Sequence, residues 1–337
     1  MDASFQNDSA ILRALPAGSR ITTASPHGQT NWSKGLRITV ETDDKEETLF
    51  LKLIEREGAE SMAVGEYTSQ KELHQCIPEN ISPALAHGTL EPNPGTAFFL
   101  TKFHDLRPGV IDPTRLATIL TKLHRISSSP TGKFGFPVTT FKGYIPVNNA
   151  WTDTWEEFFA RQFKHEIAWE QSVRGADAEM EQVAEEFFDK VIPRLLRPLQ
   201  SEGRNINPVL CHGDLWHGNI EFDVATQDPI MFDSCFDLSL MVAPRYDLGA
   251  LHVAGYTKQM GVSEPREDFD DRLMLYHLRN ELVVSGLWAK CAHLREDVKR
   301  SMRNLIDKYP EGLEGAEPII KLNEKVVLHG PTTTTGM

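Results

Sequence analysis

The chain has 337 residues, 40% of them hydrophobic, and a formal net charge of −13 at pH 7. This length and apolar content are enough for one large core or two modest ones, so a two-lobed globular protein is possible. The acidic balance argues against a nucleic-acid partner, because affinity for a phosphate backbone depends largely on Lys and Arg.

The cysteines and the apolar runs set further limits. The four cysteines are scattered, without a C-x-x-C pair or zinc-ligand spacing, so we expect reduced thiols. The N-terminus lacks a basic segment followed by an apolar run, and no apolar stretch approaches the roughly 20 residues of a membrane-spanning helix. We therefore expect a cytoplasmic protein without a membrane partner. The oligomeric state is left open.

The first hundred residues are rich in strand-forming runs. Residues 36–41 and 48–53 are two such runs separated by a polar turn, which predicts a hairpin. A helix is expected over 59–73 and a buried strand over 97–103. This part of the chain therefore resembles a small sheet accompanied by one helix.

Beyond about residue 106, helical spacing dominates. Residues 116–126 have this spacing, and Thr154 followed by Glu157 is a capping-box pattern ahead of an aromatic-rich helix. Further helical segments are expected over 183–191, 269–292 and 298–309.

The helical half is interrupted between residues 208 and 233. Here 208–211 and 230–232 are expected to be short strands on either side of polar loops. The tail from Pro310, which ends in GPTTTTGM, is expected to be loosely ordered.

The interruption carries a motif with a chemical meaning. Residues 211–220 read CHGDLWHGNI and fit the H-x-D-x-x-x-x-N loop of kinases. Phosphoryl transfer needs a carboxylate that deprotonates the acceptor hydroxyl and an amide oxygen that holds magnesium, and Asp214 and Asn219 have the spacing for these roles. Asp233 follows an apolar run where a second metal-binding carboxylate is required. The alternative is an ordinary turn with capping residues.

Two histidines lie in the same motif. We expect His212 to brace the catalytic loop by hydrogen bonds rather than to transfer protons. His217 is predicted to be a surface or acceptor-site residue and not a metal ligand. Neither histidine is needed as the base if Asp214 has that role.

A lysine in the N-terminal half fits the same chemistry. Lys52 stands between two leucines in an expected strand, where a lysine is costly unless it meets an anion. Its expected partners are the α- and β-phosphates of ATP and Glu66 of the following helix. The alternative is a solvated edge lysine and a surface glutamate.

The loop that would cover the phosphates is less distinctive. Residues 25–35 contain Gly28 and Gly35 but no G-x-G-x-x-G, and we assign Gly28 to nucleotide binding. The pattern G-x-x-x-x-G-K-S/T is absent from the chain, which excludes a P-loop as the nucleotide site.

These segments together resemble the fructosamine/ketosamine-3-kinase family, especially its fungal protein-ribulosamine 3-kinase-like members, within the aminoglycoside phosphotransferase and choline kinase superfamily. The resemblance spans about residues 20–310 and is carried by several quoted segments. They are HGDLWHGN at 212–219, FLKL around Lys52, GEYTSQKEL around Glu66, LTKLHRIS at 120–127 and GKFGFPVTTFKGYIPVNNAWTDTWEEFF at 132–159.

The resemblance implies both a cofactor set and a substrate class. It implies ATP and Mg2+, with a hinge over 101–104, here Thr101 and Phe103, that grips adenine through backbone groups. It also implies that Trp216 lines a sugar pocket. The implied reaction phosphorylates the 3-hydroxyl of a ketosamine, either a small molecule or a glycated protein.

The sequence departs from the family pattern in one later segment. The family usually has G-H-x-E-x-D-L there, whereas this chain has Ala243 and Arg245 at the His and Glu positions and keeps the aspartate as Asp247. After Asp233 the family usually has Pro or Ala and then Ala or Cys, whereas this chain has Ser234 and then Cys235. We assign Arg245 and Asp247 to the acceptor site, where the departures bear on acceptor choice.

The expected fold is α+β, a bilobal protein-kinase-like fold. We place the β-rich N-lobe at 1–103, the mainly helical C-lobe at 104–310 and a tail at 311–337. The predicted function is an ATP-dependent ketosamine kinase. The alternatives are a kinase for another hydroxylated metabolite and a nucleotide-binding pseudokinase or scaffold, which would be expected to have lost Lys52, Asp214 or Asp233.

Overall fold

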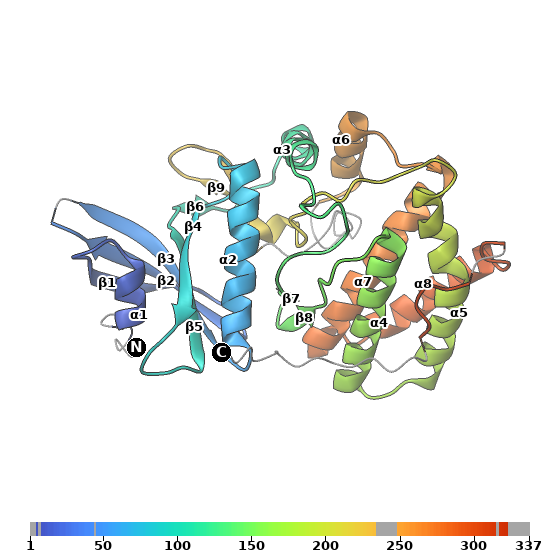
Figure 1. The fold of residues 1–337 in the computed structure, drawn as a ribbon, viewed down its shortest axis with the longest axis horizontal. Coiled ribbons are helices and arrows are strands. Elements are labelled where there is room, and N and C mark those ends of the chain that lie inside the picture. The colour runs from blue at the N-terminus through green and yellow to red at the C-terminus, as the bar shows by residue number, and fades with distance from the viewer. Residues whose placement is uncertain (1–4, 6–7, 44, 234–247, 315–316, 323–337) are drawn as a thin grey trace.

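The structure is a computed structural model of the whole chain, and its description covers all residues except 1–4, 6–7, 44, 234–247, 315–316 and 323–337. Figure 1 shows two lobes, a twisted sheet with one long helix and a larger helical part. The α+β, two-lobed architecture expected from the sequence is confirmed. The exact lobe boundary after residue 103 stays a prediction.

A five-stranded antiparallel sheet forms the N-lobe. Its order is β1-β2-β3-β5-β4, so β3 and β5 lie side by side in its centre. The predicted hairpin is confirmed as β2 and β3, in which Leu36 faces Leu51. The expected strand over 97–103 is β5, whose first six residues are all buried. The strands are β1 Arg20–Gln29, β2 Ser33–Glu41, β3 Glu46–Glu55, β4 Ala84–Thr89 and β5 Thr96–Lys102.

Two helices accompany this sheet. The short helix α1, Ser9–Ala14, begins at Asp8, whose carboxylate accepts from the amides of Ala10 and Ile11. The long helix α2, Ala59–Cys76, packs against β4 and β5 and confirms the expected helix, with three more residues at its end. Because α2 follows β3 directly, it brings a helical side chain close to the centre of the sheet.

A small second sheet lies where the lobes meet. β6, Leu106–Arg107, pairs with β9, Ile220–Asp223, which pairs with β10, Pro229–Met231. Buried apolar residues of helix α3, Pro113–Ile126, pack beneath these strands, and α6, Ala250–Met260, lies against α3. The loop before β9, which contains the predicted catalytic motif, therefore packs on a buried apolar cluster.

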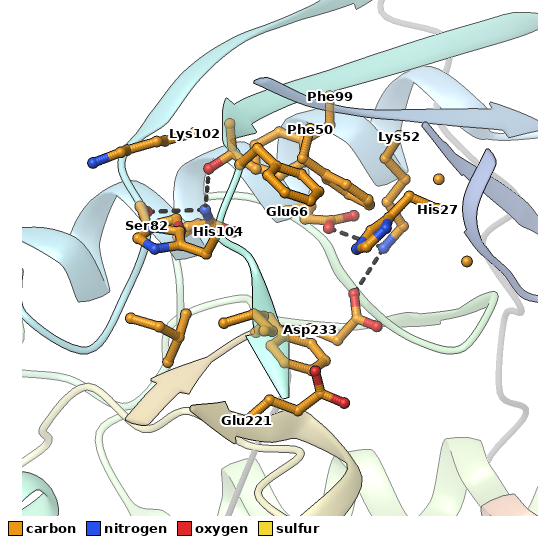
Figure 2. Close-up of a pocket in the computed structure, with 18 of the residues that line it drawn as sticks. His27, Phe50, Lys52, Glu66, Ser82, Phe99, Lys102, His104, Glu221 and Asp233 are labelled. Carbon is orange, nitrogen blue, oxygen red and sulfur yellow. Dashed lines mark hydrogen bonds and ion pairs between the residues drawn. The ribbon is translucent and has the colours of Figure 1, made fainter. Parts of the chain in front are cut away.

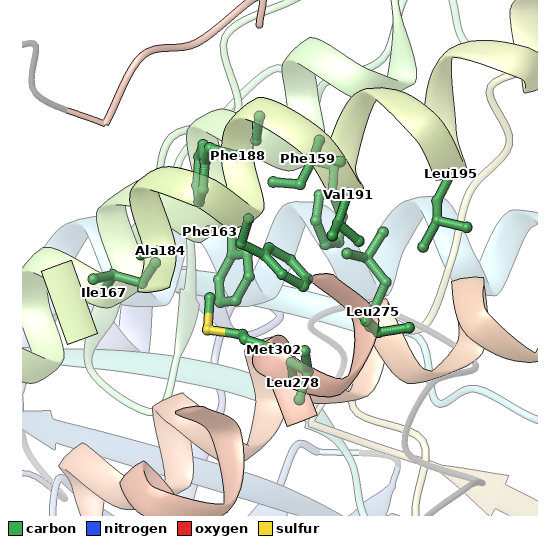
Figure 3. Close-up of a cluster of buried hydrophobic side chains, with 14 of the residues drawn as sticks. Phe159, Phe163, Ile167, Ala184, Phe188, Val191, Leu195, Leu275, Leu278 and Met302 are labelled. Atoms are coloured by element: carbon green, nitrogen blue, oxygen red, sulfur yellow. The ribbon is translucent and has the colours of Figure 1, made fainter. Parts of the chain in front are cut away.

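Four helices build the C-lobe core. They pack through buried aromatic and aliphatic side chains, of which Figure 3 shows Phe163 and Phe188 from neighbouring helices. The hydroxyl of Thr154 accepts from the Glu157 amide, as the capping pattern predicts. The helices are α4 Trp155–Arg174, α5 Ala178–Leu196, α7 Phe269–Leu287 and α8 Leu294–Lys308, and the 3-10 turns are η2 Arg197–Gln200, η3 His217–Asn219, η6 Arg266–Asp268 and η7 Ala289–Cys291.

The hairpin of β7, Thr140–Lys142, and β8, Ile145–Val147, lies between α2 and α4 (Figure 1). A buried carboxylate of α4 anchors it. Glu166 accepts from Lys142 Nζ at 2.9 Å and from Arg279 of α7 at 2.6 and 2.7 Å. The hairpin is thus tied to the C-lobe core by a buried ion cluster.

Two predicted elements are corrected. Residues 208–211 are not a strand, because their hydrogen bonds go to the segment after α3: Pro208 O accepts from the Ser129 amide and the Leu210 amide donates to the Ser127 hydroxyl. The expected helix over 269–292 ends at Leu287, because Trp288 has extended backbone angles before the turn η7. The last part of the tail, 323–337, lies outside the described residues.

Within the described ranges, no helix is long and apolar enough to cross a membrane.

Candidate active site

A cavity of about 340 Å³ lies between the sheet of the N-lobe and the strands β9 and β10. Figure 2 shows side chains from both layers pointing into it. All five residues that the sequence assigns to nucleotide binding line this cavity, together with Asp233. They are Gly28, Lys52, Glu66, Thr101 and Phe103.

Lys52 connects the two layers. Its Nζ lies 2.9 Å from Glu66 Oε1 of α2 and 2.8 Å from Asp233 Oδ1 after β10 (Figure 2). The Lys52 side chain is 12% exposed, whereas that of Asp233 is 46% exposed. The lysine is therefore withdrawn behind a carboxylate that still faces the cavity.

Burial and neighbouring charges shift the pKa values of Lys52, Asp233 and Glu66 in different directions. Burial alone would lower the pKa of Lys52, but the charges of Asp233 and Glu66 hold it above its usual value. The Lys52 ammonium lowers the pKa of Asp233, whereas burial raises the pKa of Glu66. Lys52 and Asp233 thus stay ionised as a pair at neutral pH.

The residues of the expected hinge line the larger cavity. Thr101, on β5, is buried, and its hydroxyl donates to Pro83 O and accepts from Gln70 of α2. After Phe103 the chain passes to β6, and His104 Nδ1 lies 2.8 Å from Asp223 Oδ2 of β9. These contacts fix the crossing between the lobes beside the cavity.

The cavity also has lining residues that the sequence did not indicate. The ring of His27 on β1 packs on Phe103, with centroids 4.8 Å apart, and Phe50 of β3 lies beside it. A Cβ at Gly35 would lie 2.3 Å from the His27 carbonyl oxygen and 2.9 Å from the Phe50 ring. Gly35 is therefore required for β1 to approach β2 this closely, a role that strand periodicity alone cannot reveal.

The catalytic-loop residues come together as their spacing predicts. Asn219 Nδ2 donates to the Asp214 carboxylate at 2.8 Å and to the Asp214 backbone oxygen at 2.8 Å. The Phe232 amide donates to the Asn219 carbonyl oxygen at 3.2 Å, which brings the residue before Asp233 against the loop. Burial and the negative charge of Asp233 raise the pKa of Asp214 to about 6.

His212 lies behind this loop and is buried. Burial lowers the pKa of its imidazole to about 4, so the ring is neutral at physiological pH. Neither ring nitrogen has a well-aligned hydrogen-bond partner among the described residues, but the Phe232 backbone interacts with the ring and raises its pKa against the effect of burial. The expected bracing of the loop by His212 stays a prediction.

A second, smaller cavity of about 100 Å³ adjoins Asp214. Lys52, Glu66 and Asp233 line it as well, so the two cavities share one polar wall. Its other wall is made by side chains and two glycines that the sequence did not single out. These are Trp32, Met62, Gly65, Ser69, Thr140, Phe141 and Gly143.

The residues predicted for the acceptor site are not brought together around the two cavities in the way the nucleotide-site residues are. Trp216 and His217 pack on each other with ring centroids 4.8 Å apart, and a Cβ at Gly218 would meet the Trp216 ring at 2.4 Å. Neither aromatic residue is among those that line the two cavities. Arg245 and Asp247 lie outside the described residues.

The residues around the cavities suit a hard cation such as Mg2+. Within the described chain no three His, Cys, Asp or Glu side chains gather into a self-sufficient metal site. Mg2+ is commonly held by one or two protein oxygens together with phosphates and waters, and Asp233 supplies a partly exposed carboxylate. Because Asn219 Nδ2 is used by Asp214, its amide oxygen is the atom left to bind a cation.

Comparisons with known proteins were made on sequence first. A sequence profile of the family described as fructosamine kinase matches residues 11–308. The chloroplastic protein-ribulosamine 3-kinase of Oryza sativa subsp. indica is 26% identical over 221 residues, which are 62% of this chain and 61% of that protein. The ketosamine-3-kinase of Mus musculus is 32% identical over 151 residues, 43% of this chain and 46% of that protein. The chain thus spans about three fifths or less of the length of these relatives.

Solved structures resemble the fold over most of its length. A structure assigned to a fructosamine-3-kinase of Haemophilus somnus has a TM-score of 0.67 at 17% identity, covering 90% of this chain and 99% of that one. An aminoglycoside phosphotransferase solved with ADP and hygromycin B has a TM-score of 0.52 at 12% identity, covering 84% and 94%. These likenesses establish the protein-kinase-like fold.

The family resemblance inferred from the motifs is confirmed by the extent of the profile match, which includes the sheet, the catalytic loop and all the described C-lobe helices. The chain belongs to the fructosamine kinase family.

Proposed function

We propose that the chain is an ATP-dependent kinase that phosphorylates a sugar-type hydroxyl of a ketosamine, as a small molecule or on a glycated protein. The observation that carries the proposal is the convergence of Lys52, Asp214 and Asp233 on two adjoining cavities. The larger cavity would take the nucleotide and the smaller one the acceptor hydroxyl. Family membership supports this choice over other phosphoryl acceptors.

On the nucleotide side, Lys52 would bind the α- and β-phosphates while Glu66 keeps its ammonium in place. Asp233 and the amide oxygen of Asn219 would hold Mg2+, which neutralises charge developing on the transferred phosphoryl group. The present contact of Lys52 with Asp233 fits this role, because it keeps both ionised groups at the edge of the cavity. Thr101 and Phe103 would border the adenine.

On the acceptor side, Asp214 would accept the proton of the attacking hydroxyl. Its carboxylate is oriented by Asn219, and its pKa of about 6 is close to neutral pH, where a general base is most effective. The hydroxyl oxygen then attacks the γ-phosphorus, the bond to the bridging oxygen breaks, and ADP leaves. Trp216, His217, Arg245 and Asp247 remain predicted acceptor residues.

A kinase for a different hydroxylated metabolite is the second candidate. It is favoured by Arg245, which stands where the family has a carboxylate. An arginine is permanently cationic and only donates hydrogen bonds, so it attracts an anionic acceptor and repels an ammonium.

The deciding experiment is ADP formation by the purified chain with Mg-ATP and a panel of acceptors: ribosyl-lysine, fructosyl-lysine, a glycated protein, amino sugars, polyols and sugar phosphates. Saturable turnover of a ketosamine, abolished in Asp214→Asn, is expected. Turnover of a sugar phosphate or polyol with none of a ketosamine would establish the second candidate. ADP binding without turnover of any acceptor would instead indicate a nucleotide-binding scaffold.

A further inference from the structure

An aromatic contact joins the two lobes beside the catalytic aspartate. Trp32 lies in the turn between β1 and β2 of the N-lobe. Its ring centroid is 6.2 Å from that of Tyr144, at an edge-to-face angle of 66°, and 6.1 Å from that of Trp288 after α7. Such aromatic pairs are favourable beyond the area that they bury.

The N-lobe turn holds Trp32 in a defined position. The Thr30 hydroxyl accepts from the amides of Trp32 and Ser33, at 3.3 and 3.0 Å. The Thr30 amide donates to the Ser33 carbonyl oxygen at 2.9 Å, which closes the turn. The side chain that reaches the other lobe thus projects from an internally hydrogen-bonded turn.

The C-lobe side is fixed as well. Tyr144 lies between the strands β7 and β8, and its ring packs on Trp169 of α4 at 6.0 Å. The Arg56 guanidinium lies 4.0 Å from the Tyr144 ring centroid. The neighbouring Lys142 is held by Glu166, so the hairpin cannot shift without breaking a buried ion pair.

A glycine permits the close approach. Gly143 has a φ of +61°, and a Cβ there would lie 3.3 Å from Leu287 and 3.4 Å from Trp32. The hairpin turn therefore lies directly against the indole, with little space for a side chain between them.

Trp32 also lines the cavity of about 100 Å³ that contains Asp214. We infer that Trp32 is an acceptor-positioning residue, whose indole closes this cavity on the acceptor side and offers its apolar face to the sugar ring. Tyr144 and Trp288 hold the indole there. The inference rests on the proposed kinase function and adds a residue that limits access of water to the γ-phosphate.

A purely structural aromatic contact is the competing explanation, and it makes different kinetic predictions. If Trp32 only joined the lobes, its loss would lower every activity in proportion. If it closes the acceptor cavity, its loss should weaken acceptor binding and also let water compete as the nucleophile. The ratio of ATP hydrolysis to phosphoryl transfer therefore separates the two.

The test compares Trp32→Ala and Trp32→Phe with the control Tyr67→Ala. Tyr67 is a partly buried aromatic residue of the same lobe that packs on His87 and lines neither cavity. Steady-state transfer, ATP hydrolysis without acceptor, and ADP affinity are measured for each variant. In Trp32→Ala we expect the acceptor KM and the hydrolysis-to-transfer ratio each to rise about tenfold, with ADP affinity within about threefold of wild type. Trp32→Phe should recover most of the loss, and Tyr67→Ala should match wild type.

A proportional fall of transfer and hydrolysis in Trp32→Ala would overturn the inference, as would kinetics equal to those of Tyr67→Ala. Failure of the proposed function has a different appearance: the wild-type chain would transfer no phosphate to any ketosamine. In that case hydrogen–deuterium exchange with ADP bound still tests whether Tyr144 holds Trp32 in place. Tyr144→Ala should speed backbone exchange in residues 29–34, whereas Tyr67→Ala should not. Unchanged exchange of residues 29–34 in Tyr144→Ala would show that Tyr144 does not hold Trp32.

Discussion

The proposed nucleotide cavity and the proposed acceptor cavity share Lys52, Glu66 and Asp233 but are built in different ways. The nucleotide side depends on charged groups that short sequence motifs already contain. The proposed acceptor side is lined by Trp32 of a β-turn, and the rings that pack on Trp32 come from a hairpin and the end of a helix, far apart in the sequence. Binding the phosphates thus needs a few fixed charges, whereas shaping the acceptor site needs the packing of both lobes.

The largest effect is expected from removing Asp214, the proposed base, which lines the smaller cavity. Asp214→Asn should keep the loop folded, because an amide can retain the contact with Asn219, and should bind ADP normally. Turnover should fall by about two to four orders of magnitude, the range for loss of a positioned base. Steady-state kinetics and ADP titration check this, with the exposed Asp228→Asn as control. Near wild-type turnover in Asp214→Asn would show that another group is the base.

The second change is aimed at the support of the acceptor side. Glu166→Gln leaves Lys142 and Arg279 buried without a compensating charge, so the free energy of unfolding should fall by about 3 kcal/mol. The partly exposed pair of Glu186 and Lys190 on α5 supplies the control Glu186→Gln, with an expected loss below about 0.5 kcal/mol.

Because Glu166 holds the β7–β8 hairpin, the Glu166→Gln variant should also raise the acceptor KM while leaving ADP affinity nearly unchanged. Urea unfolding and kinetics below the transition measure both effects. If ADP affinity weakens as much as acceptor affinity does, the β7–β8 hairpin supports both cavities and not the acceptor cavity alone.

Arg245 offers a smaller change in acceptor choice. Reversing its charge in Arg245→Glu should shift preference toward glycated lysine by roughly 1–3 kcal/mol, or about 5- to 150-fold in relative kcat/KM. The measurement compares ribosyl-lysine with an anionic sugar in wild type, Arg245→Glu and the exposed control Arg266→Glu. Efficient wild-type use of ribosyl-lysine that the substitution leaves unaffected would remove Arg245 from the acceptor site.

The smallest effect concerns a histidine in the helices that support the catalytic loop. Burial lowers the pKa of His124 to about 4, and its Nδ1 lies 2.7 Å from the Tyr256 hydroxyl of α6. With an unfolded pKa of about 6.5, the unfolded state binds more protons, so stability is full above pH 6.5 and falls as the pH drops toward 4.

This titration should lower the free energy of unfolding by about 1 kcal/mol between pH 7.5 and 5.5. In His124→Gln that share of the pH dependence should disappear, while the share from His212, whose pKa is also lowered to about 4, persists. Denaturant unfolding at a series of pH values is the measurement. An identical pH slope in the variant and wild type would mean that His124 accepts a proton without cost.

The sequence predicted the elements with strong periodicity and the residues within motifs. The β2–β3 hairpin, α2 and β5 follow from alternating or helical apolar spacing, which burial reinforces locally. The strand predicted over residues 208–211 was wrong. Their apolar content is typical of a strand, but their backbone hydrogen bonds are made with the loop after α3.

What the sequence determined by itself was the charge chemistry: a lysine in an apolar strand, and Asp214, Asn219 and Asp233 at spacings that a short loop can bring together. Only the tertiary structure decided which aromatic and small residues surround that chemistry. The closeness of Trp32 to Tyr144, and of Gly35 to His27 and Phe50, depends on how strands and lobes pack in three dimensions. Local propensity does not specify such long-range contacts, because they form between segments that leave no mark on each other's sequence pattern.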